Sequence, residues 1–396
     1  MELLSPAGNL EKLRYAYAYG ADAAYIGVRS FSLRTRADNF HADEHEVIRT
    51  IKGDKKLFGA LNIFFHDQDI AELESHLDYL SLYPFDAFII SDIGILPLLR
   101  SRFPSIPLHL STQANCLNSE AAKLYGDLGF SRIILGRETS LREVEQIKNR
   151  AGDMEIEVFV HGAMCLAYSG RCLLSSYMAD RSANRGDCSH SCRWNYRLLE
   201  EEKRPGEYYP IMEDEGGFTT ILSSKDLCMI DHIRELQDAG VNSLKIEGRM
   251  KSLYYTAVVT RAYRKALDHM DDPTAWAAYR EDLFKVSHRE YSTGFFFSPH
   301  EMDRSTTKSY QREYLFLGTL TKEISPGTFT LEVRNHIRSG ELLEYIGPDI
   351  PYLSDDQYII RDDQGIPVTQ ADHGKAYTIT PGVPCREGYI IRKKIF

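Results

Sequence analysis

The chain has 396 residues, of which 43% are hydrophobic, and this length suits a large barrel with a small second domain better than one ordinary domain. Its net charge of −10 argues against a general polyanion binder, although a local basic patch would still allow a nucleic-acid substrate. No apolar run is long enough to predict a membrane span, and no basic or apolar leader follows Met1, so we expect a cytoplasmic protein.

Short apolar runs alternate with amphipathic stretches along the chain as far as Arg249. Largely apolar strands separated by helices indicate a parallel sheet that is covered on both faces. Eight such units predict a (β/α)8 barrel over residues 1–305, with a doubly wound open sheet as the alternative. The eight expected strands are Glu2–Pro6, Ala23–Gly27, Leu57–Phe65, Ala87–Asp92, Pro107–Ala114, Arg132–Glu138, Glu157–Gly162 and Ser243–Arg249.

Polar residues gather where several of these strands end, and in a barrel the carboxyl ends of the strands build the active site. Alternation along the fifth expected strand predicts that its polar side chains share one face. A capped strand end or a turn would explain any one of these positions equally well. The positions are His109, Ser111, Gln113 and Asn115 on the fifth strand, Arg137 and Glu138 after the sixth, His161 after the seventh, and Glu247 and Arg249 after the eighth.

A long insertion, about residues 163–242, separates the seventh and eighth strands and far exceeds a usual βα loop. Within it, Ser224–Leu227 reads as the start of a helix. Residues 254–270 predict a long amphipathic helix beyond the eighth strand. From about Tyr314 short alternating strands predict a small all-β domain, a β-barrel over residues 312–396.

Five of the seven cysteines lie in this central insertion. In a chain expected to stay in a reducing compartment, clustered cysteines indicate metal ligands or catalytic thiols rather than disulfides. Four thiolates are the usual ligands of an iron–sulfur cluster and also of structural zinc. Because one pair has a zinc-like spacing and the other is wider, the pattern favours a cluster, 4Fe-4S, over zinc. The five candidate ligands are Cys165, Cys172, Cys188, Cys192 and Cys228.

Two other interpretations of the central cysteines remain open. They could be buried thiols that behave as small hydrophobic side chains, which is also our interpretation of the two remaining cysteines, Cys116 and Cys385. Cys165 lies four residues after His161, so the two side chains would also suit a cysteine–histidine nucleophile pair.

Several stretches of the chain have a specific motif character. They are residues 2–8, 19–22 and 31–34, 157–165 with 170–175, 184–188 with 192–194, and 204–207, 224–227 and 244–249. Together these stretches resemble the signature of peptidase family U32, the collagenase-like family, and the resemblance covers most of the chain.

Within the family the chain looks most like the prephenate-dependent tRNA uridine hydroxylation proteins. This resemblance implies a barrel with a small β domain, an iron–sulfur cluster, and formation of 5-hydroxyuridine at the wobble position of tRNA with prephenate as a source of the hydroxyl group. Cys165 and Cys172 match the first two cluster positions, and two further ligands are expected among Cys188, Cys192 and Cys228.

The chemistry of these substrates suggests further site residues. Prephenate has two carboxylates, so we expect arginines in its pocket, although a surface salt bridge would explain each of them as well. His161 and His109 are candidate acid–base groups, and Gln113 could bind the Watson–Crick edge of uracil; packed histidines and capping amides are the alternatives. The candidate arginines are Arg34, Arg36, Arg137, Arg171 and Arg249.

Three other functions remain as alternatives to a tRNA hydroxylase. A U32-type peptidase is one, although the sequence contains neither a Gly-x-Ser-x-Gly elbow nor a His-Glu-x-x-His motif. A hydroxylase of quinone precursors and a binding module without enzymatic activity are the others. The sequence predicts neither the tRNA identity nor the oligomeric state.

Overall fold

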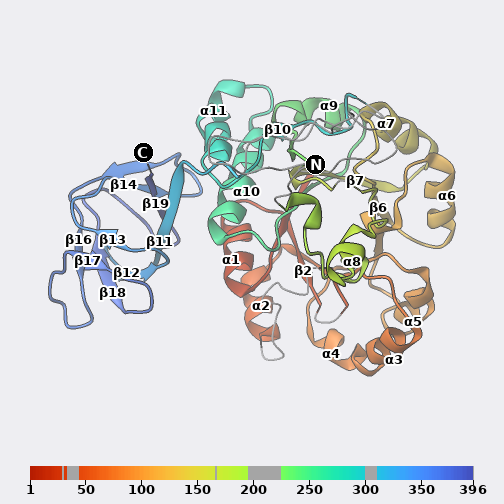
Figure 1. The fold of residues 1–396 in the computed structure, drawn as a ribbon, viewed down its shortest axis with the longest axis horizontal. Helices are drawn as coiled ribbons and strands as arrows, with labels where there is room; N and C mark the ends of the chain where they lie inside the picture. The colour runs from red at the N-terminus through yellow and green to blue at the C-terminus, as the bar shows by residue number, and fades with distance from the viewer. Residues whose placement is uncertain (29–30, 34–43, 166, 195–223, 299–309, 396) are drawn as a thin grey trace, which may run out of the picture.

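A computed structural model describes residues 1–28, 31–33, 44–165, 167–194, 224–298 and 310–395. It shows a helix-wrapped barrel on one side and a separate β domain on the other (Figure 1). Arg34 and Arg36, two of the expected substrate-binding arginines, lie outside the described residues.

Eight parallel strands form a closed ring, which confirms the predicted barrel. β1 pairs with β2 and with β9, and β7 closes the ring by pairing with both β6 and β9. The ring consists of β1 (Glu2–Pro6), β2 (Ala23–Gly27), β3 (Lys56–Leu61), β4 (Ala87–Ile90), β5 (Leu108–Leu110), β6 (Arg132–Ile134), β7 (Glu155–Ala163) and β9 (Ser243–Ile246).

Helices cover the outside of the ring. Five of the ten helices named below begin at a side chain that accepts a backbone N–H. At α7, for example, Ser140 and Glu143 form a capping box, while Val144 and Ile147 are buried. The outer helices are α1 (Leu10–Ala18), α2 (His45–Lys52), α3 (Asp67–Ser75), α4 (Leu77–Leu82), α5 (Leu96–Arg102), α6 (Ser119–Asp127), α7 (Leu141–Arg150), α9 (Ile233–Asp238), α10 (Leu253–Asp268) and α11 (Pro273–Glu281).

The barrel encloses charged side chains as well as apolar ones. Glu157 on β7 accepts hydrogen bonds from Lys245 Nζ at 2.8 Å and from Arg132 Nη1 at 3.0 Å. Burial alone would raise the pKa of Glu157, but the two cations outweigh burial and hold that pKa below its ordinary value. Arg132 also bonds Glu2 at 2.5 Å, so the buried charges neutralise one another.

The insertion after β7 contains a strand where the sequence suggested a helix. β8 (Asp226–Cys228) pairs antiparallel with the last residues of β7, and β10 (Tyr291–Ser292) extends the sheet. The Asp226 carboxylate is taken by Arg289 Nη2 at 2.6 Å instead of capping a helix. The expected helix start at Ser224–Leu227 is therefore wrong, because this buried ion pair and the pairing with β7 override the local capping pattern.

The C-terminal part is an antiparallel all-β domain with its own apolar core, as predicted. Its main sheet has the order β15-β14-β19-β11-β12-β18-β16, and β13 pairs with β17. The strands are β11 (Tyr314–Ser325), β12 (Thr328–Val333), β13 (Ile337–Arg338), β14 (Leu343–Ile346), β15 (Leu353–Asp355), β16 (Ile359–Arg361), β17 (Gln370–Ala371), β18 (Tyr377–Thr380) and β19 (Ile390–Lys394).

Buried charges also join this domain to the barrel. Asp282, just after α11, accepts hydrogen bonds from Arg261 on α10 and from Arg392 on β19, the latter at 2.8 Å. All three residues are almost completely buried. Among the described residues, no helix combines the length and apolar character needed to cross a membrane.

Candidate functional site

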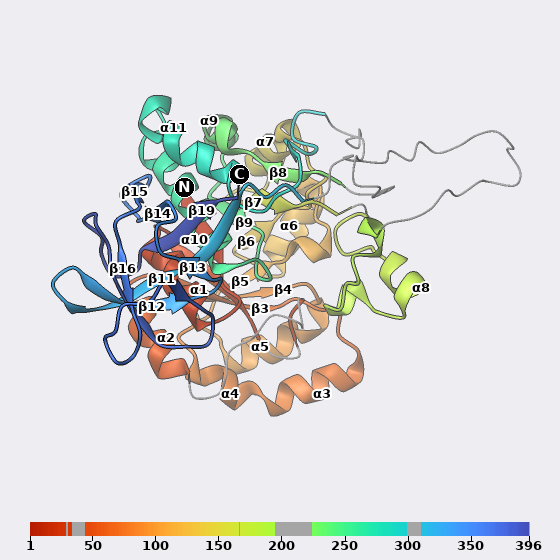
Figure 2. The same cartoon turned by 60° about the vertical axis from the view of Figure 1, so that its left-hand side comes forward.

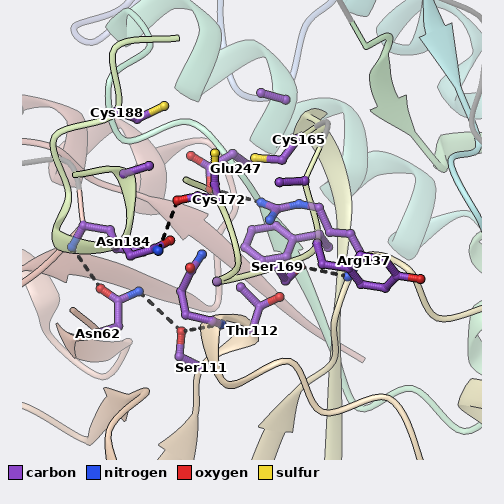
Figure 3. A pocket seen from close by; sticks show the side chains of 18 of the residues that line it. Asn62, Ser111, Thr112, Arg137, Cys165, Ser169, Cys172, Asn184, Cys188 and Glu247 are labelled. Atoms are coloured by element: carbon purple, nitrogen blue, oxygen red, sulfur yellow. Dashed lines mark hydrogen bonds and ion pairs between the residues drawn. The ribbon is translucent and has the colours of Figure 1, made fainter. Parts of the chain in front are cut away.

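A cavity of about 390 Å³ opens at the carboxyl ends of the barrel strands. Polar side chains from several strand ends line it, and the segment that follows β7 covers part of it (Figure 3). In this view Cys165, Cys172 and Cys188 lie at one end of the cavity, and Ser111 and Thr112 lie at the other. This is the end of the barrel at which enzymes of this fold place their active sites.

The polar residues after β5 form a turn rather than a continued strand. β5 ends at Leu110, Ser111 Oγ accepts the backbone N–H of Gln113 at 3.3 Å, and Asn115 adopts the left-handed conformation with φ 55°. The expected shared strand face is therefore wrong for Gln113 and Asn115. Gln113 nevertheless lines the cavity, whereas Asn115 Nδ2 lies 3.5 Å from Glu138 Oε2.

Arg137 lies at the cavity wall after β6. Its guanidinium stacks on Phe159, with Cζ 3.8 Å from the ring centroid, and Nη2 lies 3.4 Å from Glu247 Oε2. Both partners also line the cavity. The Phe159 ring and the Glu247 carboxylate hold the Arg137 guanidinium in one orientation. The guanidinium can therefore donate two parallel hydrogen bonds to a bound carboxylate.

Arg249 lines the cavity from the end of β9 and reaches across to Ser32 Oγ at 3.2 Å. A Cβ at Gly27 would lie 2.1 Å from Arg249 Nη1, so the glycine that ends β2 leaves room for this guanidinium. Arg171, by contrast, is exposed and is not among the residues that line the cavity. The structure thus brings together Arg137 and Arg249 and leaves Arg171 at the surface.

Lys245 is a cavity residue that the sequence reasoning missed. Its Nζ lies 4.5 Å from the centroid of the Tyr25 ring, and both residues line the cavity. Burial lowers the pKa of Lys245, although the ion pair with Glu157 opposes that shift. A lysine inside an otherwise apolar strand was the available signal, because a buried charge needs a partner or a function.

Four of the five candidate cysteine ligands line this cavity: Cys165, Cys172, Cys188 and Cys192. The backbone N–H of His190 donates to Cys188 Sγ at 3.4 Å. Gly170, between the first two cysteines, packs closely against the turn after β5, since a Cβ at Gly170 would lie 2.1 Å from the Gln113 carbonyl oxygen.

Cys228 lies apart from the other four. It pairs with His161 across β7 and β8, its Sγ lies 4.0 Å from the Tyr263 hydroxyl, and burial raises the pKa of its thiol to about 11. Within the described part of the chain, no three His, Cys, Asp or Glu side chains converge on one point in a geometry that would hold a single metal ion. The four cavity cysteines therefore line one cavity without converging on the site of a single metal ion.

The two candidate histidines are packed inside the protein and do not line the cavity. His161 is surrounded by the rings of Tyr255, Tyr263 and Tyr291, and burial lowers its pKa to about 3. His109 lies edge-on to Phe58 at 4.9 Å, and burial together with the nearby Arg132 lowers its pKa well below the ordinary value. The geometry therefore provides neither residue with a path to a substrate in the cavity.

The fold and the site define a (β/α)8-barrel protein with a cationic, cysteine-lined cavity at the carboxyl ends of its strands. The family model described as peptidase family U32 matches residues 8–306, and the model of the family's C-terminal domain matches residues 312–392. The chain therefore belongs to peptidase family U32.

Its relatives include proteins named for different activities. The chain is 38% identical to tRNA hydroxylation protein P of Escherichia coli, over 88% of this chain and 86% of the relative. It is 38% identical to the 23S rRNA 5-hydroxycytidine C2501 synthase of Escherichia coli, over 79% of this chain but 44% of that protein. It is 31% identical to a protein named collagenase of Porphyromonas gingivalis, over 88% of this chain and 85% of the relative.

Proposed function

We propose that this protein is a tRNA-modifying hydroxylase that forms 5-hydroxyuridine at the wobble position, with prephenate as the source of the hydroxyl group and an iron–sulfur cluster as cofactor. The main observation in support of this proposal is that one cavity combines cationic side chains with four cysteines. The relatives named for hydroxylation of tRNA and rRNA support RNA as the substrate class.

The cations of the cavity suit a dicarboxylate such as prephenate. Arg137 and Arg249 present guanidinium groups from the ends of β6 and β9, and Lys245 adds a positive charge beside Tyr25. In the proposed complex each arginine binds one carboxylate, and the ring of prephenate packs against the aromatic wall. Gln113 and Asn62, which also line the cavity, offer amide donors and acceptors to the uracil edge.

The four cavity cysteines fit an iron–sulfur cluster by donor type and by shared location. We assign Cys165, Cys172, Cys188 and Cys192 as its ligands and leave Cys228 out, because Cys228 does not line the cavity. A cluster with four thiolate ligands supplies one-electron transfer or local structural order. In the proposal, this chain's own residues bind the prephenate carboxylates, orient the uracil and limit the access of water.

Mass spectrometry of tRNA nucleosides from a strain that lacks the gene tests the proposal. We expect 5-hydroxyuridine derivatives to disappear and to return with the wild-type gene, but not with Cys165→Ser or Cys172→Ser. Cys385→Ser is the matched control, because Cys385 packs against the core of the C-terminal domain. Restoration of the modification by Cys228→Ser would support the assigned ligands, and an unchanged nucleoside profile in the deletion strain would exclude the proposed reaction.

A peptidase is the second candidate, because one relative is named collagenase. Protein purified without oxygen separates the two functions. The hydroxylase proposal predicts a coloured protein with several iron atoms per chain and no cleavage of denatured collagen. Colourless protein that cleaves collagen, and that loses this cleavage in a Cys165→Ser variant, would support the peptidase. Hydroxylation of a quinone precursor with unchanged tRNA would support the remaining alternative.

A further inference from the structure

The cysteine segment, residues 164–194, exposes large apolar side chains beside the cavity. Tyr168 is 58% exposed, Leu173 is 74% exposed and Tyr177 is 86% exposed. Most large apolar side chains of the barrel are instead buried in its core. Neighbouring exposed side chains of this size at the mouth of a cavity are typical of an interaction surface.

Local geometry places the three side chains in one strip. Tyr168 and Leu173 both line the cavity while remaining exposed, so the strip begins at the cavity mouth. Leu173 precedes helix α8 (Leu174–Ala179), and its carbonyl oxygen accepts the N–H of Tyr177 at 3.0 Å. This spacing of one helical turn places Tyr177 next to Leu173 on the same face of α8. Figure 2 shows α8 standing out from the barrel on the side away from the C-terminal domain.

Polar contacts hold the strip in place against the barrel. Glu138 accepts hydrogen bonds from Ser169 N at 2.8 Å and from Ser169 Oγ at 3.2 Å. Farther along, Arg185 bonds Asp69 at 2.7 Å, and Asn184 Nδ2 donates to the carbonyl oxygen of Cys172 at 3.1 Å. The exposed side chains therefore stand on a backbone that is already ordered, which reduces the entropy lost on binding.

The segment has more arginines than acidic residues. Residues 164–194 contain four arginines and two aspartates, and Arg181 and Arg185 form ion pairs with Asp187 and Asp69. Arg171 lies between Tyr168 and Leu173 in sequence and is exposed. Exposed aromatic side chains beside an arginine are typical of sites for single-stranded RNA, where bases stack and phosphates pair with cations.

We propose that the strip Tyr168–Leu173–Tyr177 is the docking surface for the anticodon loop of the RNA substrate. This inference rests on the proposed tRNA-hydroxylase function and extends it to the recognition step. A uridine that enters the cavity must leave the base stack of the loop, which costs stacking energy. Bases on either side of the extruded uridine stack on Tyr168 and Tyr177 and recover that energy, while Leu173 separates them at the cavity mouth.

Fluorescence anisotropy with a labelled anticodon stem-loop that carries uridine at the wobble position tests the inference. For Tyr177→Ala we expect the Kd to rise about 5- to 150-fold, the range measured for loss of one stacked base. Tyr177→Phe should bind like the wild type, because stacking needs only the ring. Tyr352→Ala is the matched control, since Tyr352 is a 43% exposed tyrosine of the C-terminal domain. Equal melting temperatures of all variants would show that folding is unaffected.

The outcomes separate this inference from the function on which it rests. If wild type hydroxylates tRNA and Tyr177→Ala, Tyr168→Ala and their double variant all bind the stem-loop as tightly as wild type, the docking surface is wrong and the hydroxylase stands. If wild type neither binds nor modifies the RNA, both proposals fall. If the alanine variants retain RNA affinity but change the molar mass in solution, the strip joins two copies of the chain, and RNA docking is excluded.

Discussion

The interior of the barrel and the cysteine segment differ in which side chains they bury and which they expose to water. Inside the barrel, Glu157, Lys245 and Arg132 are nearly inaccessible to water and neutralise one another. In the cysteine segment, Tyr177 and Leu173 are largely exposed, and the backbone is tied to the barrel by single polar contacts such as Ser169 to Glu138.

The difference separates the parts of the molecule that determine stability from those that contact ligands. Removing a buried charge leaves its partner unpaired in a medium of low polarizability, which costs several kcal/mol. Removing an exposed side chain costs little free energy of unfolding, because it had few contacts to lose. We therefore expect substitutions in the two regions to have different consequences, and three predictions test this contrast.

The largest effect is expected for Glu157→Gln. This change leaves Lys245 without its carboxylate partner and weakens the neutralisation of Arg132, so the free energy of unfolding should fall by about 3–5 kcal/mol. Glu155→Gln is a matched control, because Glu155 also bonds Arg132 at 2.7 Å but its side chain is 46% exposed; its loss should stay below about 1 kcal/mol. Urea unfolding measures both values, and equal losses would refute the contrast.

A gradual effect, smaller per pH unit than the loss expected for Glu157→Gln, is expected from the pH dependence of stability through His161. The pKa of the buried imidazole is about 3, whereas its ordinary value is 6.5. Between these values the unfolded chain binds a proton that the folded chain does not, so stability decreases as the pH falls from about 6.5 toward 3. One such group contributes a slope of up to about 1.4 kcal/mol per pH unit.

Urea unfolding at a series of pH values would detect this slope in the wild type and compare it with two variants. His161→Gln should show a shallower dependence below about pH 6.5, because the proton uptake of this group on unfolding is removed. His269→Gln changes an exposed histidine and should leave the slope as it is. Identical slopes in all three proteins would show that His161 is not the group responsible.

The smallest effect on global stability is expected for Glu138→Ala. Glu138 anchors Ser169 in the loop between Cys165 and Cys172, so hydrogen exchange should accelerate in residues 165–172. The free energy of unfolding should change by less than about 1 kcal/mol, because the loop contributes little to the core. Glu120→Ala, which removes an exposed ion pair with Lys123, should leave exchange in this loop unchanged. Unaltered exchange in Glu138→Ala would show that this contact does not hold the loop.

The sequence predicts the barrel well because eight apolar runs separated by helices suit a parallel sheet that is covered on both faces. The pairing of β7 with β9 closes the ring and excludes the open sheet. The sequence fails where two local structures share one pattern. The alternation from Ser111 to Asn115 suits a strand and a side-chain-supported turn equally, and only the hydrogen bond from Gln113 N to Ser111 Oγ decides between them. Likewise, Asp226 resembles a helix cap in the sequence, but in the structure its carboxylate binds Arg289, which is distant along the chain.

The candidate site shows the same limit. Spacing alone could not divide the five cysteines, because the separation of Cys228 from the rest depends on β8 pairing with β7. The positions of His109 and His161 on the strands suggest acid–base groups, but the sequence does not distinguish a buried ring among tyrosines, such as His161, from a catalytic one. Lys245, in contrast, was visible as a charge within an apolar strand.

Buried ion pairs around Asp282 link the two matched family regions. A boundary between residues 306 and 312 is natural for comparing sequences, but it cuts a chain whose Arg392 and Arg261 share one carboxylate in the interior. A barrel expressed without its β domain would lose Arg392, one of the cations that Asp282 binds, while Arg261 remains. The β domain therefore supplies part of the charge balance of the barrel's own interior, and the barrel is expected to depend on it for stability.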